Sequence, residues 1–304
     1  MSDKTFQDKA VIVTGASSGI GRALTLRLAD QGAWIVLAAR DAQRLDALAE
    51  ECRQRGGKAI AVPTDVTDEA RCKVLIERAV AELGRLDMLI NNAGIGATGL
   101  LEELPDLTVF KRVMDVNFYG TVYCTYYAVK HLKQTQGRIV NISSLGGKSP
   151  LPYNTNYIAS KYAVHGFSDS LRMELAKAGV SITLICPYWV VTEFHERLMD
   201  KDGTPRGPKG RAIYSDKTMT ADECAAIALK AAARRKREVL MGPGWPAIWL
   251  RMIAPGLVDK ITIEMVLKPA ARRVTKEKKA RNSGRRIVSR LRAAKSPLEA
   301  LRYE

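Results

Sequence analysis

The residues YIASK, at positions 157–161, place a tyrosine four residues before a lysine in a stretch with helical periodicity. Residues i and i+4 share one face of a helix, with β-carbons about 5–6 Å apart. At an effective dielectric constant near 20, an ammonium about 5 Å away favours a phenolate by about 3 kcal/mol, or roughly two pKa units. Tyr157 and Lys161 are therefore predicted to act as an acid/base pair near neutral pH.

Two polar residues upstream could act with this pair. Ser144, in NISSLGG, precedes Tyr157 by 13 residues, and its hydroxyl could donate a hydrogen bond to a substrate oxygen. Asn117, in DVNFYG, lies within a predicted helix, where asparagine is unfavourable unless it has a polar task. A lone YxxxK is common by chance and usually marks a helix-surface pair, but the joint presence of these residues favours catalysis.

The elements that must position these residues alternate in type. Apolar runs such as KAVIVTG, WIVLAAR, LDMLINNAG, GRIVNIS and VSITLICP are separated by segments of helical periodicity. This pattern indicates βαβ units and a parallel sheet covered on both faces. TADE at 220–223 resembles a capping box that opens a helix before a last strand, REVLMG. The sequence therefore predicts an α/β fold: a Rossmann-type doubly wound parallel sheet of about seven strands.

The connections between the strands differ in character. Helices are expected at about 107–132 and 156–178, whereas residues 193–219 have no clean period and are expected to form a mobile loop. Ligands of a doubly wound sheet bind beyond the carboxyl ends of its strands, and the candidate motifs of this sequence fall at such ends.

The segment TGASSGIG follows the first predicted strand and opens the first helix. Gly15, Gly19 and Gly21 would permit a tight turn and close approach of a phosphate to the helix amides. The spacing is GxxxGxG, and a plain strand-to-helix turn is the alternative interpretation. The second strand ends in Ala39 and Arg40, where NAD-binding folds have a carboxylate. A guanidinium suits a 2′-phosphate, so we predict NADP(H), unless Arg40 is an ordinary surface arginine.

Together these motifs resemble the short-chain dehydrogenase/reductase family over about residues 8–245. The resemblance implies that Tyr157 is the general acid/base and that Lys161 lowers its pKa and holds the nicotinamide ribose. It implies that Ser144 polarises the substrate carbonyl and that Asn117 holds a water of the proton relay. The implied reaction is hydride transfer between NADP(H) and a carbonyl or secondary alcohol.

The resemblance also implies contacts to the cofactor. In TDVT two residues resemble the adenine contacts, NNAG resembles the segment that lines the cofactor, and PYWVVT resembles the segment beside the carboxamide. Tyr188 replaces the usual glycine there, which puts the local backbone shape in doubt and could narrow the pocket. The predicted cofactor-binding residues are Gly15, Ser17, Ser18, Gly19, Ile20, Gly21, Arg40, Asp65, Val66, Asn92, Ala93, Gly94, Tyr157, Lys161, Pro187, Val190 and Thr192.

The overall composition narrows the class of protein. Of 304 residues 46% are hydrophobic, which suffices for a substantial core. Five scattered cysteines without a CxxC pair favour a reduced, cytoplasmic protein, and the N-terminal residues contain no signal-peptide pattern. The three histidines lack metal-ligand spacing, so no metal is expected.

The C-terminal segment differs from the rest of the chain. The net charge is +16, of which residues 268–304 carry +10. We predict an NADP-binding domain at 1–245 and an amphipathic, basic extension at 246–304. The extension could pack on a second subunit or cover the pocket, or it could lie at a membrane interface, but charges interrupt it too often for a spanning helix. It lacks the interleaved aromatic residues of a nucleic-acid module, so nucleic acid is an unlikely partner.

Similar extensions occur in family members that act on steroids, retinoids and other lipids, so the resemblance implies a lipophilic substrate and a homo-oligomer. Two alternatives stay open at this point. One is a ketoreductase of acyl groups on an acidic carrier protein, and the other is a non-enzymatic NADP-binding sensor or scaffold. The set Asn117, Ser144, Tyr157 and Lys161 favours an enzyme, because a sensor would not need all four.

Overall fold

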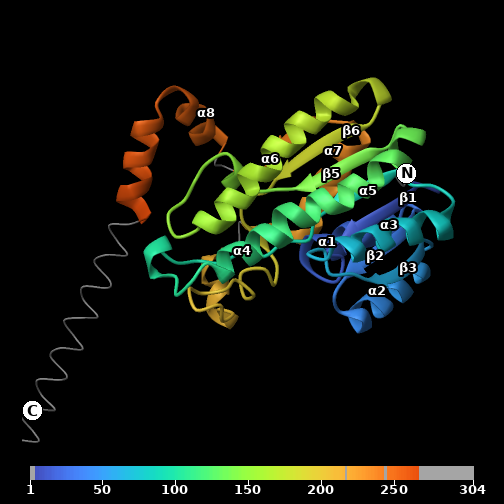
Figure 1. The fold of residues 1–304 in the computed structure, drawn as a ribbon, viewed down its shortest axis with the longest axis horizontal. Coiled ribbons are helices and arrows are strands. Elements are labelled where there is room, and N and C mark those ends of the chain that lie inside the picture. Colours follow the sequence, from blue (N-terminus) through green and yellow to red (C-terminus); the bar gives the residue numbers. More distant parts are fainter. Residues whose placement is uncertain (1–3, 216–217, 243–244, 267–304) are drawn as a thin grey trace, which may run out of the picture. The chain divides into compact units, whose positions relative to one another are not determined.

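The computed structural model describes residues 4–215, 218–242 and 245–266 (Figure 1). The chain divides into two compact units, residues 1–249 and 250–304. The first unit contains the whole sheet, and in the second unit residues 255–266 are helical. Among the described residues, no helix combines the length and the apolar character that crossing a membrane requires.

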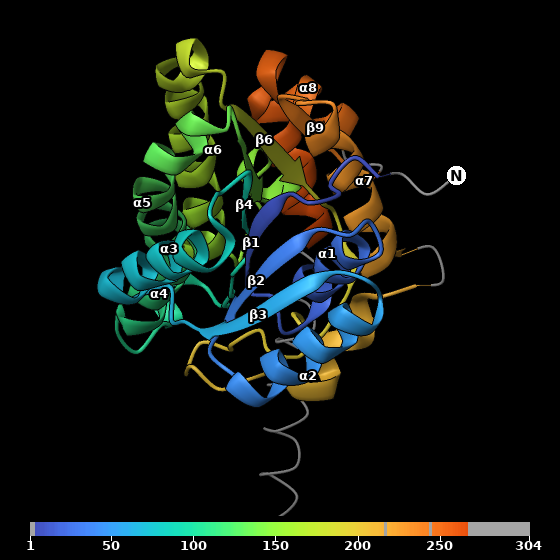
Figure 2. The ribbon, with the colours of Figure 1, turned by 90° about the vertical axis from the view of Figure 1, so that its right-hand side faces the viewer.

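Seven parallel strands form one sheet in the order β3-β2-β1-β4-β5-β6-β9 (Figure 2). The order reverses between β1 and β4, so the crevice for a ligand is expected at the carboxyl ends of these two strands. The predicted Rossmann-type doubly wound sheet is confirmed. The strands are β1 (Ala10–Thr14), β2 (Trp34–Ala39), β3 (Lys58–Pro63), β4 (Met88–Asn91), β5 (Arg138–Ile142), β6 (Ser181–Cys186) and β9 (Glu238–Leu240).

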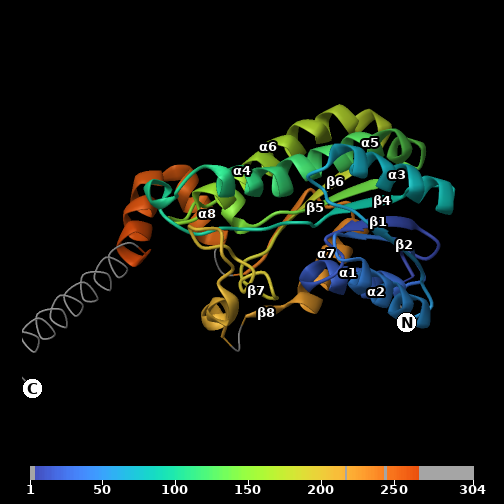
Figure 3. The same cartoon turned by 60° about the horizontal axis from the view of Figure 1, so that its bottom comes forward.

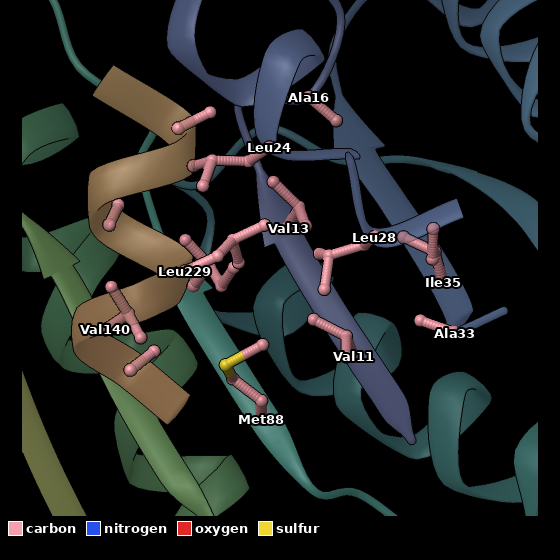
Figure 4. Packing of buried hydrophobic residues seen from close by; sticks show 14 of the residues in the cluster. Val11, Val13, Ala16, Leu24, Leu28, Ala33, Ile35, Met88, Val140 and Leu229 are labelled. Carbon is pink, nitrogen blue, oxygen red and sulfur yellow. The ribbon is translucent and has the colours of Figure 1, made fainter. Parts of the chain in front are cut away.

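Helices cover both faces of the sheet (Figure 2 and Figure 3). One face packs against α1 (Gly19–Ala29), α2 (Ala42–Gln54) and α7 (Ala221–Ala233), and the other against α3 (Glu69–Leu83), α5 (Gly120–Gln134) and α6 (Thr155–Leu175). Each layer encloses its own apolar cluster. In Figure 4, Leu24 and Leu28 of α1 and Leu229 of α7 surround Val11 and Val13 of β1. The apolar runs of the sequence are thus buried from both sides, as parallel strands require.

The helix predicted at about 107–132 contains a π-helical turn. It begins as α4 (Thr108–Met114), widens into the π-helix η2 (Asp115–Tyr119) and continues as α5. Such turns occur frequently at functional sites. A β-carbon on Gly120, directly after this turn, would lie 2.7 Å from Val66 Cγ2. The helix therefore passes close to the segment after β3, and a larger residue would not fit there.

Residues 193–219 have more structure than the predicted loop. Val190–Val191 (β7) pair with Met219–Thr220 (β8), and Gly207–Ile213 form the 3₁₀ helix η5. Met199 is buried, accepts a hydrogen bond from Thr98 N at 2.8 Å and donates one to Gly96 O at 3.0 Å. No local sequence pattern indicates these anchors, because they join residues about 100 positions apart.

The remaining elements are short. The 3₁₀ turns are η1 (Leu101–Glu103), η3 (Leu145–Gly147) and η4 (Ala176–Ala178), and α8 spans Trp245–Ile253. The predicted capping box is present at the start of α7, where Thr220 Oγ1 accepts from Glu223 N at 3.2 Å and Glu223 Oε2 accepts from Thr220 N at 2.8 Å. Ile248 of α8 is buried with Leu145 and Val164, so the core of the first unit extends beyond residue 245.

Candidate active site

Ser144, Tyr157 and Lys161 come together beyond the carboxyl end of β5. Ser144 caps η3, where its Oγ accepts a hydrogen bond from Gly146 N at 3.0 Å. Tyr157 and Lys161 lie one turn apart near the start of α6, with Lys161 Nζ at 5.6 Å from the centre of the Tyr157 ring. Lys161 Nζ donates to Ile142 O at 3.0 Å, which fixes the ammonium against the end of β5.

Burial controls the acidity of this site. It raises the pKa of Tyr157 to about 12, and a hydrogen bond from Ser144, which favours the phenolate, offsets only part of the rise. Burial also lowers the pKa of Lys161 to about 8. The predicted lowering of the Tyr157 pKa by Lys161 is therefore wrong for the protein chain alone. The lost hydration outweighs the hydrogen bond from Ser144, and Ser144 rather than Lys161 is the neighbour that lowers the pKa.

Asn117 is buried in the π-helical turn, and its side chain bonds to protein groups. Its Oδ1 accepts from Ile95 N at 2.8 Å, and its Nδ2 donates to Ile95 O and to Ser160 Oγ, each at 2.9 Å. Ser160 Oγ in turn donates to the carbonyl of Tyr157 at 2.7 Å. Both amide hydrogens of Asn117 are thus used to position the segment after β4 and the first turn of α6. A water of the kind implied by the resemblance would therefore have to donate to an oxygen of Asn117.

The glycine-rich turn has a backbone that strongly favours glycine. Gly15 and Gly19 have φ values of +63° and +53°. A β-carbon on Gly21 would lie 2.2 Å from Gly15 O. Asn92 Nδ2 locks this turn to the end of β4 by donating to Thr14 O at 2.9 Å and Gly15 O at 3.1 Å. The turn therefore presents bare backbone at the start of α1, which fits the diphosphate of a dinucleotide.

The predicted residues after β4 lie beside this turn. Asn92 N and Ala93 N donate to Thr14 Oγ1 at 3.0 and 3.1 Å, and a β-carbon on Gly94 would lie 3.8 Å from Lys161 Nζ. The segment 92–94 thus joins the glycine-rich turn to the Tyr157 site.

Residues after β6 cross the start of α1. A β-carbon on Gly19 would lie 3.2 Å from Thr192 Cβ, and Ser18 Oγ accepts from Arg197 Nη1 at 3.0 Å. Ser17 and Ile20 are half-buried in the same turn. Thr192 and Arg197 therefore close one side of the glycine-rich turn, and Arg197 is a neighbour that the sequence did not reveal.

Pro187, Tyr188 and Val190 lead into that segment. Pro187 and Val190 are buried, and Pro187 O accepts from Leu145 N at 3.0 Å. Tyr188 does not have a positive φ and is 46% exposed, with its Cβ directed toward Gly242. The tyrosine therefore stands in place of the family's usual glycine with a backbone that does not require glycine, which answers the doubt about the local backbone shape.

An open pocket of about 430 Å³ lies at the carboxyl ends of β2 and β3. Arg40 and Arg71 line it together with Asp65, whose pKa is raised by burial but lowered more by hydrogen bonds from Thr67 and by the charges of Arg40 and Arg71. Val66 lies beside it, buried against Gly120. The full lining is Arg40, Pro63, Thr64, Asp65, Thr67, Asp68 and Arg71.

Two arginines line this pocket, whereas the carboxylate of Asp41 does not. Asp41, the carboxylate directly after Arg40, caps α2 by accepting from Arg44 N at 3.0 Å, and it is not among the lining residues. Arg71 lines the pocket although no motif marks it. In the sequence, Arg71 could be found only through the helix start that precedes it. Asp68 caps α3 by accepting a hydrogen bond from Arg71 N at 3.1 Å, which places Arg71 in the first turn of that helix.

Aromatic rings gather beside Tyr157. The Phe194 ring lies 5.8 Å from the Tyr157 ring between centres, Trp189 lies 5.1 Å from His195, and His195 Nδ1 contacts Tyr214 Oη at 2.6 Å. Tyr214 Oη donates to Thr192 O at 2.9 Å, so His195 is the donor in its bond to Tyr214. Sequence patterns did not indicate Phe194, His195 or Tyr214, because the segment 193–219 that carries them follows no motif.

The comparisons with known proteins agree with this arrangement. A family model described as "short chain dehydrogenase" matches residues 9–203. The chain belongs to the short-chain dehydrogenase/reductase family. Members of this family are oxidoreductases that act on hydroxyl groups with a nicotinamide cofactor. As a member, this chain is an oxidoreductase that acts on hydroxyl groups and uses a nicotinamide cofactor.

Three similar proteins illustrate the relationship. An 11-beta-hydroxysteroid dehydrogenase of Pinus massoniana is 35% identical over 83% of this chain and 72% of its own length. The 11-beta-hydroxysteroid dehydrogenase-like 3 protein of Arabidopsis thaliana is 42% identical over 61% of this chain and 60% of its own. A solved short-chain dehydrogenase/reductase from Burkholderia phymatum, in complex with NAD, has a TM-score of 0.73 and 28% identity and covers 83% of this chain and 96% of its own.

The buried His195 predicts an acid-sensitive contribution to stability. Burial, assisted by the charge of Arg206, lowers the pKa of His195 to about 4. A histidine in the unfolded chain titrates near 6.5, so its contribution is complete above that pH and is lost as pH falls toward 4. We expect the His195→Asn variant, in which this titration is absent, to lose about 1 kcal/mol less unfolding free energy than wild type between pH 7 and 5.5. Urea unfolding at both pH values measures this difference, and equal losses in the two proteins would contradict it.

Proposed function

We propose that this protein is an NADP(H)-dependent oxidoreductase that interconverts a carbonyl and a secondary alcohol on a lipophilic substrate. The observation that carries the proposal is the meeting of three groups in one site: the half-buried Ser144 hydroxyl and Tyr157 phenol and the buried Lys161 ammonium. This site borders the segment 92–94, which leads to the glycine-rich turn.

Each group has a distinct task in the proposed reaction. When bound, the nicotinamide supplies or accepts the hydride. Ser144 holds the substrate oxygen by a hydrogen bond, and Tyr157 exchanges a proton with that oxygen. Lys161, fixed by Ile142 O, would hold the ribose hydroxyls of a bound cofactor and present its charge to the phenol. Asn117 is a positioning residue, because it acts through Ser160 and Ile95.

The preference for NADP(H) rests on the pocket beside β2 and β3. Arg40 and Arg71 line it, and Asp41 is engaged as a helix cap. A 2′-phosphate would meet two guanidinium groups there, each suited to bind phosphate oxygens. The solved Burkholderia phymatum relative contains NAD, so the preference proposed for this chain depends on its own arginines.

The lipophilic character of the substrate rests on the wall beside Tyr157. The Phe194 ring lies beside the Tyr157 ring. Leu198 lies near both rings at Gly96, where a β-carbon would be 3.4 Å from Tyr157 Cδ2 and 3.5 Å from Leu198 Cδ2. A ring wall of this kind favours an apolar substrate over a small polar one. The name of the Pinus massoniana relative, a hydroxysteroid dehydrogenase, supports the same substrate class.

The segment from α8 onward supports peripheral contact of this cytoplasmic enzyme with a membrane. Several large apolar side chains in it are exposed, including Met252 at 72%, Ile253 at 85% and Met265 at 66%. They precede the stretch 268–304, whose net charge is +10 and which lies outside the described residues. Apolar side chains beside a basic stretch suit an anionic lipid surface. The domain division at 245, the homo-oligomer and the absence of nucleic-acid binding stay predictions.

The Tyr157→Phe variant tests the proposed acid/base. Removal of the hydroxyl leaves no group to exchange the proton, so we expect kcat to fall by at least about 100-fold. The Kd for NADPH, measured by its fluorescence, should stay nearly unchanged. Tyr162→Phe is the matched control, since Tyr162 lies on the same helix with an exposed side chain. Near-normal turnover by Tyr157→Phe would overturn the assignment.

The Arg40→Asp variant tests the cofactor preference. A charge-assisted hydrogen bond contributes about 1.5–3 kcal/mol, so the ratio of kcat/KM for NADPH to that for NADH should fall by about 10- to 100-fold. Arg78→Asp is the control, because Arg78 is an exposed residue of α3 outside the pocket. An unchanged ratio in Arg40→Asp would refute the role of Arg40.

Substitution tests the membrane contact better than truncation. A cut at residue 246 would remove Ile248, which is buried with Leu145 and Val164, and would damage the core. We expect the Met252→Ser/Ile253→Ser variant of the 304-residue chain to sediment less with phosphatidylserine-containing vesicles than wild type does. Met173→Ser, at another exposed apolar residue, is the control. No sedimentation of wild type with these vesicles would end the proposal.

A further inference from the structure

Three potential metal ligands from distant parts of the sequence meet next to the active site. His165 comes from α6, Cys186 ends β6, and Glu238 begins β9. Cys186 Sγ lies 3.6 Å from His165 Nε2 and 3.7 Å from Glu238 Oε1, and His165 Nδ1 lies 3.7 Å from the same carboxylate oxygen. We call these three residues the His–Cys–Glu cluster.

The spacing of the cluster is close to that of a zinc site. Ligand atoms around tetrahedral zinc, bound at about 2.0–2.3 Å, are about 3.3–3.6 Å apart. In the cluster, one ligand atom of each side chain lies within 4.8 Å of the others, and the two distances to the sulfur are 3.6 and 3.7 Å. Inward shifts of a few tenths of an ångström at the sulfur, together with a turn of the imidazole, would complete three ligand positions.

The chemistry of the cluster also suits zinc. A thiolate, an imidazole and a carboxylate are the three donor types that zinc binds, and with three protein ligands the fourth position is left open. His165 and Cys186 are buried, so the surroundings exclude competing water, while the Glu238 side chain is 23% exposed and offers a path for entry. On binding, the thiol would release its proton to solvent.

One cation already contacts the cluster. Lys148 Nζ lies 3.1 Å from Glu238 Oε1, and its side chain is 31% exposed. A metal ion would have to displace this ammonium, which can swing into solvent because it is partly exposed. Lys148 therefore competes with a metal ion for the Glu238 carboxylate, and its removal should strengthen metal binding.

The cluster also contacts the turn that carries Ser144. A β-carbon on Gly147, the last residue of η3, would lie 2.5 Å from two atoms of the His165 ring. A turn of the imidazole toward a metal would therefore change the packing beneath η3.

We propose that His165, Cys186 and Glu238 form a zinc-binding site, and that Lys148 holds Glu238 when zinc is absent. This assignment opposes the expectation of no metal drawn from the sequence. Cys186 lies 21 residues from His165 and 52 from Glu238, and the three follow no ligand motif, so only the fold brings them together.

The test is calorimetric titration of the chelator-treated 304-residue protein with zinc chloride, without cofactor or substrate. We expect one saturable site, at least about tenfold weaker in Cys186→Ala and Glu238→Gln and tighter in Lys148→Met. Cys52→Ser, at a buried cysteine of α2, should bind zinc like wild type. Cobalt titration should give a thiolate charge-transfer band that Cys186→Ala lacks.

Several outcomes would overturn the assignment: no zinc binding by wild type, equal affinity in Glu238→Gln, or weaker binding in Lys148→Met. If Cys186→Ala fails to fold, the two variants at the partly exposed Glu238 and Lys148 still decide the question. All these readouts are independent of turnover, so failure of the zinc site and failure of the proposed reductase activity are distinguishable.

Discussion

Loss of hydration around Tyr157 and Lys161 is the constraint on which the rest of the site depends. It raises the pKa of the phenol to about 12 and lowers that of the ammonium to about 8, so it disfavours the charged form of both. Each pKa unit corresponds to about 1.4 kcal/mol between the two protonation states. The bond from Lys161 to Ile142 O and the bond from Ser144 to Tyr157 recover part of this free energy. These two bonds hold the phenol and the ammonium in place beyond the end of β5.

The fold supplies these contacts through the ends of its parallel strands. Thr14 at the end of β1 accepts from the segment after β4, and Asn117 joins that segment to α6 through Ser160. The π-helical turn directs the Asn117 amide toward both partners. Because these bonds connect β1, β4 and α6, the glycine-rich turn and the Tyr157 site are positioned by one network of buried polar groups.

The sequence predicted the parts of the site that local patterns encode. The glycine turn, the YxxxK pair and the seven strands follow from spacing and apolar runs. Arg71 and the pair of His195 and Tyr214 do not, because they depend on contacts between distant segments. Spacing also predicted the wrong direction for the Tyr157 pKa, since a helical spacing gives the distance to Lys161 but not the burial of either group.

One face of α6 connects catalysis to the packing beneath it. Tyr157, Lys161 and His165 follow at intervals of four residues, so they share that face. The η3 turn lies against it, with β-carbon positions on Gly146 and Gly147 only 2.8 Å from Ile158 Cδ1 and 2.5 Å from the His165 ring. A residue larger than glycine at 147 would meet the His165 ring, and one at 146 would meet the flexible end of the Ile158 side chain. The His165 ring is therefore packed directly against the turn that carries Ser144.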